Sequence, residues 1–459
     1  MTRKDIALCV RELSRNRRHL DFTTMAETGH PSDLAEELAT LPRASVLSLL
    51  RGLDGETAAS LFSYFSEELQ TGLFHDMNKE EAARLLKHLP ADERADLYGL
   101  LDAQARRNIL PSLEQGIRED MLHLASFPEE STGSATTSEY ISVLPETRVA
   151  AALKTVRAAA RGSETASIVY VLDREKHLLG TVSLRELLLA DDNAAVESIM
   201  RRRPVSVRAS WPRTRSTEMI RRYDLLALPV MDDDNKMMGI ITVDDAMDIE
   251  KEQDASQLAR FGGTATADDT DLDILKSSLP AMFRVRVFWL IFLTVFGVIT
   301  STFVAAQEEI LSRVIVLAAF IAPIVDMGGN TGSQSATLVI RAMAVGDVTL
   351  CLSDLWRVFR REMPVACALG LSVAVLEGIL AWFSKDISFD VVLTVGLSMF
   401  VCTAAGGVIG LCLPFVARRM GTDPATLSSP LITSIMDLFG VCIYFAFAYL
   451  FLGDLLIGV

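Results

Sequence analysis

The stretch Ala425–Leu452, ATLSSPLITSIMDLFGVCIYFAFAYLFL, decides the fold of this chain. It is long and apolar enough to cross a membrane, which takes about 20 residues of helix, yet it contains the carboxylate of Asp437. A carboxylate at membrane depth is costly unless it is hydrated, paired or bound to a cation. Steps of four residues back from Asp437 reach Thr433 and Ser429, so three oxygen-bearing side chains share one stripe of the predicted helix. The stretch therefore predicts a transmembrane helix with a stripe suited to a cation.

A second apolar run is interrupted by Pro323-Ile-Val-Asp-Met-Gly-Gly-Asn-Thr-Gly-Ser-Gln334. Pro323 lacks an amide donor, and Gly328 and Gly329 destabilise a helix, so we expect the backbone to open there. Such backbone is tolerated at membrane depth where it lines a cavity or is buried in protein. Freed carbonyls and the Asn330 amide would suit a cation or its hydration water. The alternative is an ordinary helix end, because Gly-Gly-Asn also caps helices well.

Five runs are long enough to span a bilayer, and they cover approximately 287–306, 311–329, 364–384, 390–416 and 427–453. Arginines flank the first, third and fourth runs on one side of the predicted membrane (Arg284, Arg286, Arg357, Arg360, Arg361, Arg418 and Arg419). By the positive-inside rule, this predicts a multi-pass protein of the cell inner (plasma) membrane with its N-terminus in the cytoplasm and its C-terminus outside. The first 20 residues have no apolar core for a signal peptide, which agrees with that orientation. Small residues, Gly396 and the run Ala404-Ala-Gly-Gly-Val-Ile-Gly410, would let the spans approach closely.

Charge divides the chain into two parts. Residues 1–285 carry 35 Lys and Arg against 47 Asp and Glu, whereas residues 286–459 carry 9 against 12. The first part is therefore predicted to be soluble and acidic, and it lacks the basic surface that nucleic acid requires. Acidic clusters suit hard divalent cations such as Mg²⁺ or Ca²⁺, although a solubilising surface is the plainer interpretation. The six cysteines form no CxxC pair, so no zinc site is expected.

Apolar residues recur every twelve positions near the N-terminus, at Leu41, Leu53, Phe65, Met77, Leu89 and Leu101. Each is followed by Pro, Asp, Ser or Asn, which begin helices as caps or first-turn residues. Acidic residues follow in the first turns, where the helix dipole favours them. Residues 1–130 are therefore predicted to form a helical domain that stacks into a superhelix and acts as a scaffold.

Two copies of one pattern follow, 59 residues apart. Residues 169–186, VYVLDREKHLLGTVSLRE, align with residues 228–245, LPVMDDDNKMMGIITVDD, and each copy predicts strand, acidic turn, strand and helix. The pair resembles the tandem CBS domain, an α/β regulatory module that often binds adenine nucleotides. The resemblance implies a CBS pair over 138–250 and ATP as a possible ligand. No Walker loop, Ser-His-Asp pattern or HExxH cluster is present, so we expect no enzyme.

The order of these parts resembles the MgtE magnesium channels over nearly the whole chain. The residues that carry the resemblance are PIVDMGGNTGSQSATLVIRAMAVGDV at 323–348 and SPLITSIMDLFGVCIY at 429–444. It implies a multi-domain protein: an N-terminal α-superhelical domain (1–130), the CBS pair, a connecting helix (251–283) and an all-α transmembrane domain of five helices (284–459). It also implies a homodimeric, Mg²⁺-selective channel with its pore between the second and fifth spans, and a role in magnesium homeostasis. The residues carried over to the pore are Asp437, Gly328, Gly329, Asn330, Thr433 and Ser429.

The resemblance further implies closure of the pore when intracellular Mg²⁺ bridges acidic faces of the soluble domains. The positions that match are Asp224, Asp245, Asp248 and Asp423. Two departures bear on this. Ser429 precedes Pro430 where the family often has Asn, and residues 250–257 read EKEQDASQ, with Gln253, Ser256 and Gln257 where acids are common. We therefore expect weaker or displaced gating sites, with more Mg²⁺ needed for closure.

Two other functions are compatible with parts of the sequence. An exchanger of a divalent cation against Na⁺ or H⁺ would use Glu377 or Asp326 as a titrating group. A membrane-anchored CBS sensor would conduct nothing, but it would have no need of costly polar groups at membrane depth. The polar stripe therefore favours transport.

Overall fold

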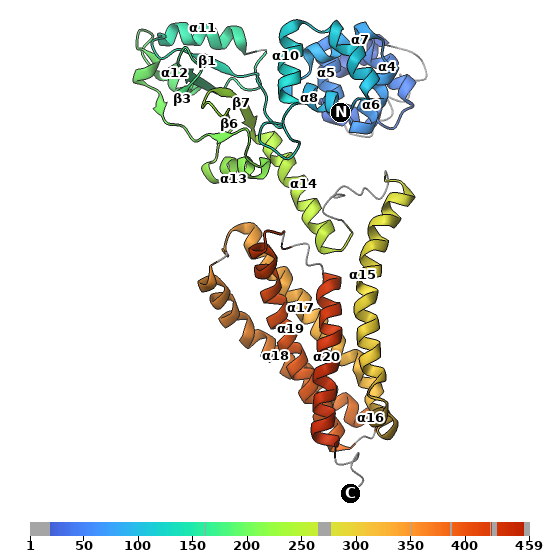
Figure 1. Ribbon diagram of the computed structural model, residues 1–459. Coiled ribbons are helices and arrows are strands. Elements are labelled where there is room, and N and C mark those ends of the chain that lie inside the picture. Colours follow the sequence, from blue (N-terminus) through green and yellow to red (C-terminus); the bar gives the residue numbers. More distant parts are fainter. Residues whose placement is uncertain are drawn as a thin grey trace. The chain divides into compact units, whose positions relative to one another are not determined.

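The computed structural model describes residues 19–160, 162–264, 277–349, 351–385, 388–422, 424 and 429–453 (Figure 1). It divides into two compact units, Met1–Lys251 and Glu252–Val459. Each unit has its own cores, and each is described by itself.

The N-terminal part of the first unit is an array of short helices. These are α2 (His19–Thr28), α3 (Pro31–Leu38), α4 (Arg43–Leu50), α5 (Gly55–Ser63), α6 (Glu67–Asp76), α7 (Lys79–His88), α8 (Ala91–Leu100), α9 (Ala103–Ile109), η1 (Leu110–Ser112) and α10 (Gln115–Leu124). From α4 to α9 a helix begins every twelve residues, which confirms the predicted cadence. Helices from α3 to α9 pack against the helix two places further along the chain. The repeating apolar residues Leu53, Phe65, Leu89 and Leu101 are buried in the shared core.

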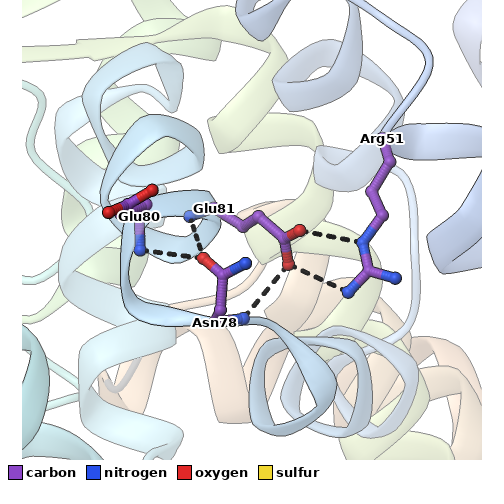
Figure 2. Close-up of polar contacts among 4 residues, drawn as sticks. All are labelled: Arg51, Asn78, Glu80 and Glu81. Carbon is purple, nitrogen blue, oxygen red and sulfur yellow. Dashed lines mark hydrogen bonds and ion pairs between the residues drawn. The ribbon is translucent and has the colours of Figure 1, made fainter.

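Polar caps fix where these helices begin. The Asn78 side chain accepts hydrogen bonds from the amides of Glu80 (3.0 Å) and Glu81 (2.9 Å), and the Glu81 carboxylate accepts one from the Asn78 amide (3.1 Å). The same carboxylate pairs with Arg51 at 2.9 and 3.1 Å, which ties α7 to the end of α4 (Figure 2). One carboxylate thus closes a capping box and joins two turns of the stack.

Replacing Asn78 with Ala should lower the free energy of unfolding of this array by about 1 kcal/mol, because two amides at the start of α7 lose their acceptor. Ser66→Ala is the matched control, since Ser66 occupies the same position before α6 without a side-chain cap bond. Chemical denaturation followed by circular dichroism measures both. Equal losses for the two variants would contradict the assigned role of the cap.

The second part of the first unit contains two similar sheets. The first repeat consists of β1 (Ile141–Val143), α11 (Val149–Ala159), β2 (Ile168–Leu172), β3 (Leu178–Ser183), α12 (Leu184–Leu189), η2 (Val196–Ser198) and β4 (Arg201–Arg202). The second consists of β5 (Val207–Arg208), α13 (Arg213–Tyr223), β6 (Ala227–Met231), β7 (Met237–Thr242) and α14 (Val243–Phe261). The sheet orders are β1-β2-β3-β4 and β5-β6-β7, each with a parallel pair followed by an antiparallel pair.

The 59-residue repeat is confirmed down to backbone detail. A bulge lies between Val171 and Leu172 in β2 and between Val230 and Met231 in β6. Left-handed residues fill the hairpins at Lys176 and Asn235, with φ of 70° and 61°. Both repeats therefore keep the same turn, in which an aspartate side chain accepts backbone amides.

The second unit contains the membrane helices. They are α15 (Leu279–Ala305), α16 (Glu308–Arg313), η3 (Ile315–Leu317), α17 (Ala318–Val345), α18 (Leu352–Lys385), α19 (Phe389–Arg419) and α20 (Ser429–Leu452). Within the described residues, five helices are long and apolar enough to span a membrane, as the sequence predicts. Helices α17, α19 and α20 pack on one another, α18 packs on α19, and α15 packs on α20. The Tyr444 hydroxyl of α20 donates to the Leu317 carbonyl at 2.9 Å, which fixes the start of α17.

Two expectations about helix ends are wrong. The backbone does not open at Gly328 and Gly329, because α17 is helical from Ala318 to Val345 with Pro323 inside it. Both glycines are instead buried against neighbouring helices, whose packing holds α17 together. The connecting region 251–283 is also not a single helix: α14 ends at Phe261, and Gly263 follows with a φ of 68°, a conformation that suits a helix end.

Candidate cation pathway and acidic joint

Glycines hold α17 against α19. A Cβ added at Gly328 would lie 2.6 Å from the Cys402 sulfur, and one added at Gly406 would lie 2.2 Å from the Gly328 carbonyl oxygen. One turn further, a Cβ at Gly410 would lie 2.0 Å from the Gly332 carbonyl oxygen. The predicted small-residue run on α19 is therefore a contact surface. Gly396 is not part of it, since no heavy atom lies within 4 Å of a Cβ built there.

The polar stripe of α20 lies beside α17. A Cβ at Gly329 would lie 3.0 Å from the Thr433 methyl carbon, and the Ser429 hydroxyl bonds that of Ser333 at 3.0 Å. The Thr433 hydroxyl donates to the Ser429 carbonyl within α20 at 3.0 Å. The structure thus brings together the two segments that the sequence singles out.

Asp437 is half-buried on α20 one turn beyond Thr433. On α17, the Asn330 amide donates to the Asp326 carboxylate at 3.0 Å, and both side chains are exposed. On either side of Asp437, Thr433 contacts Gly329, and a Cβ added at Gly440 would lie 3.2 Å from a side-chain carbon of Val325. Asp326, Asn330 and Asp437 therefore belong to the same stretch of the α17–α20 contact. Asp326 is not among the predicted pore residues. The sequence feature that could have identified it is its position one helical turn before Asn330.

A second group of acids lies between the helical array and the CBS pair. Helix α8 contributes Asp92, Glu93 and Asp96, the segment after α11 contributes Glu164, and α14 contributes Asp245. The negative charge of Asp245 raises the pKa of each of the other four carboxyl groups. Burial is the main cause of the raised pKa values of these carboxyl groups. It raises the pKa of Glu93 to about 7, that of Asp96 to about 6 and that of Glu164 to about 7. We call these five residues the acidic joint.

The acidic joint contains only one of the predicted regulatory residues. Asp245 belongs to it and accepts a hydrogen bond from the Thr242 hydroxyl at 2.6 Å. In addition to burial, the charge of Asp248, one turn further along α14, raises the pKa of Asp245. Asp224 is instead an exposed residue with a φ of 50° at the end of α13, and Asp423 lies outside the described residues. Among the residues described, no three His, Cys, Asp or Glu side chains are placed to hold a metal ion.

Arg94 forms ion pairs beside the acidic joint. It is 5% exposed, and its guanidinium lies 2.8 Å from the Glu139 carboxylate and 3.7 Å from that of Asp120. The Ser138 hydroxyl also donates to Asp120 at 2.8 Å. A buried arginine therefore links α8 and α10 to the first strand segment of the CBS pair.

Raised carboxyl pKa values give the joint a pH dependence. Folded Glu93 holds its proton to about pH 7, against 4.5 for its ordinary value, so its contribution to stability is complete below about 4.5 and is lost as the pH rises through about 7. In EDTA, the unfolding temperature of the full-length protein should fall between pH 5 and pH 8. Glu93→Gln should reduce that fall, whereas Glu80→Gln on the exposed side of α7 should not. A fall that is unchanged in Glu93→Gln would count against the assignment.

Comparison with known proteins matches each part of the chain. Residues 321–447 match the family described as "Divalent cation transporter" (MgtE), residues 29–130 match the "MgtE intracellular N domain", and residues 133–193 and 196–252 match the CBS domain. The "Magnesium transporter MgtE" of Thermus thermophilus is 33% identical over 92% of this chain and 93% of its own length. That of Bacillus subtilis is 27% identical over 99% of both chains.

Two solved structures each resemble about half of this chain. One is the soluble part of a magnesium transporter, with a TM-score of 0.53 and 27% identity, covering 55% of this chain and 99% of its own. The other is the cytosolic domain of the Mg²⁺ channel MgtE in complex with ATP, with a TM-score of 0.51 and 28% identity, covering 53% and 99%.

Proposed function

Because the chain belongs to the MgtE family of magnesium transporters, we propose that it is a Mg²⁺-selective channel through which the membrane potential drives Mg²⁺ inward. The observation that carries this proposal is the contact of α20 with α17, which places Asp437 in the region of the Asp326–Asn330 pair. Oxygen ligands of this kind suit a hard cation. Mg²⁺ sheds its water reluctantly, so a few carboxylates and amides that contact the hydrated ion are a suitable set.

The pore is proposed to involve Asp437, Asn330, Thr433 and Ser429, with Gly328 and Gly329 holding α17 in place behind it. Because α17 is a continuous helix, the role of the two glycines is to allow α17 to approach α19 and α20, rather than to offer free carbonyls. Asp326 and Asn330 are exposed on a spanning helix, where polar side chains need water or a protein partner. A homodimer with this face at its axis would provide both.

The test is Mg²⁺ influx into proteoliposomes that hold the purified full-length protein, driven only by an inside-negative potential. Influx under these conditions supports a channel. Influx that requires a Na⁺ or proton gradient would instead support a coupled exchanger, a function that the neighbouring carboxylates Asp326 and Asp437 make reasonable. No influx under any gradient would leave the membrane-anchored sensor.

The acidic joint is proposed to give feedback by intracellular Mg²⁺. Buried carboxylates repel one another when ionised, and a divalent cation removes that repulsion as a proton does. Asp245 and Asp248 keep their proposed regulatory role, and Asp92, Glu93, Asp96 and Glu164 join them. Closure should require more Mg²⁺ in this protein than in family members whose helix after residue 250 is richer in acids. Influx measured against increasing internal Mg²⁺ tests this, and closure at sub-millimolar Mg²⁺ would contradict it.

ATP binding at the CBS pair is proposed on the likeness to the ATP-bound relative. The residues that join the two repeats are apolar and buried, among them Tyr170, Leu172, Met231 and Ile240, so the centre between the sheets does not fit a triphosphate. Any nucleotide is therefore expected at the ends of the sheets. Isothermal titration of the full-length protein with ATP tests this.

In the cell, the protein is proposed to lie in the inner (plasma) membrane with its N-terminus in the cytoplasm and its C-terminus outside. The family's magnesium transporters are not enzymes, and no catalytic activity is indicated for this chain.

A further inference from the structure

Helix α18 is longer than a bilayer requires. Its 34 residues, Leu352–Lys385, extend over about 51 Å at 1.5 Å per residue, against roughly 30 Å of hydrocarbon. Its charged residues are concentrated in its first eleven positions, LSDLWRVFRRE, and only Glu377 interrupts the stretch from there to Lys385. The first three turns of α18 therefore lie at the level of the lipid headgroups.

These turns have two different faces. Leu355, Val358 and Phe359 pack against α19, where they join the buried side chains of Leu411 and Phe415. The other face is exposed and carries Trp356, Arg357, Arg360 and Arg361, with Trp356 61% exposed and stacked on Phe359. The spacing of three and four residues keeps the three arginines on one side of the helix.

The end of α19 adds two more arginines. Helices α18 and α19 are joined by residues 386–388 and pack along each other, so the last turn of α19, with the exposed Arg418 and Arg419, lies at the same end as the first turns of α18. We call Arg357, Arg360, Arg361, Arg418 and Arg419 the arginine surface. Exposed apolar side chains flank it, at Leu352 (72%), Trp356 and Met420 (75%).

Two acidic residues of α18 next to the arginine surface already have partners. Asp354 is nearly buried and accepts hydrogen bonds from the Thr349 amide (2.8 Å) and hydroxyl (2.6 Å), and it pairs with Arg357 at 3.0 Å. Glu362 accepts a hydrogen bond from the Ser335 hydroxyl of α17 at 2.6 Å. Of the five arginines, only Arg357 has an ion pair among the described residues. The surface therefore keeps a clear excess of positive charge.

From these observations, we propose that the arginine surface binds the phosphate headgroup of an anionic phospholipid in the leaflet that faces it. Guanidinium groups match phosphate oxygens with two parallel hydrogen bonds, and basic surfaces at helix ends attract anionic headgroups. The flanking Leu352, Trp356 and Met420 favour a lipid over a soluble anion, because a free phosphate has no chain for them to contact. The proposal is independent of which ion the protein transports.

The experiment is native mass spectrometry of the full-length protein in a mild detergent, titrated with phosphatidylglycerol or with phosphatidylcholine of the same acyl chains. The wild type should retain phosphatidylglycerol in preference. Arg360→Gln/Arg361→Gln should weaken phosphatidylglycerol binding roughly tenfold or more while leaving phosphatidylcholine binding unchanged. Arg284→Gln/Arg286→Gln is the matched control, since it removes the same number of arginines at the start of α15, a different helix that packs on α20.

Equal retention of the two lipids by the wild type, or equal losses in the two double variants, would overturn the proposal. Displacement of the lipid by millimolar glycerol phosphate would also overturn it, because the site would then recognise a soluble anion. Should the glutamine variant fold poorly, Arg360→Lys/Arg361→Lys keeps the charge but removes the paired hydrogen bonds, and it should bind phosphatidylglycerol with an intermediate affinity. Wild-type affinity in that variant would show that the guanidinium geometry plays no part.

Discussion

Asp437→Ala should abolish potential-driven Mg²⁺ influx, a loss of at least a hundredfold relative to the wild type. The expected size follows from removing a carboxylate that a divalent cation must pass inside a low-dielectric region, where one charge is worth several kcal/mol and each 1.4 kcal/mol is a factor of ten. Asp437 is half-buried between helices, so the alanine is tolerated by the fold. Influx of Mg²⁺ into proteoliposomes, monitored with an internal fluorescent indicator, gives the result directly.

Glu377→Gln provides the comparison, because Glu377 is also an acid within a spanning helix but lies on α18, away from the α17–α20 contact. It should retain most of the influx. Equal losses in the two variants would show a general sensitivity to intramembrane charge rather than a pore at Asp437. Undiminished influx in Asp437→Ala would end the assignment of the pore to α20.

Gly410→Ala should disrupt the membrane unit more than any single methyl group added elsewhere on α19. The new Cβ would lie 2.0 Å from the Gly332 carbonyl oxygen and 2.8 Å from its Cα, and backbone cannot yield as a flexible side chain can. Overpacking typically costs 1–3 kcal/mol and occasionally more. We expect a marked fall in folded yield and an unfolding temperature lowered by several degrees, measured by fluorescence-detected size exclusion after heating.

Gly396→Ala is the matched control on the same helix, because no heavy atom lies within 4 Å of its added Cβ. It should be neutral or slightly stabilising, since alanine favours helix over glycine. If both alanines destabilise equally, the close approach of α17 and α19 is not what the glycines provide.

Periodic features of this chain could be predicted from the sequence because each is determined locally. The twelve-residue cadence combines a buried apolar residue with a cap, so it fixes both the length and the start of each helix. The 59-residue repeat retains its turns and bulges for the same reason. The membrane spans follow from apolar length alone.

The differences between the predicted and the observed structure have a common cause. Gly328 and Gly329 lower the local preference for helix, but they also let a neighbouring helix approach, and only the partner decides which effect prevails. That partner, Gly406 on α19, is far away in sequence. The acidic joint was missed in the same way: Asp92 and Glu93 resemble ordinary first-turn acids, and their relation to Glu164 and Asp245 arises from the packing of the array on the CBS pair.

The stacking of α3 to α9 also affects how this protein is made. Each helix contacts partners only about two dozen residues away, and chains with such short-range contacts fold quickly. The array emerges from the ribosome well before α15, and domains commonly fold in that order during synthesis. The array is therefore expected to be compact before the first membrane helix reaches the insertion machinery, so a folded N-terminal domain would already hinder translocation of the N-terminus.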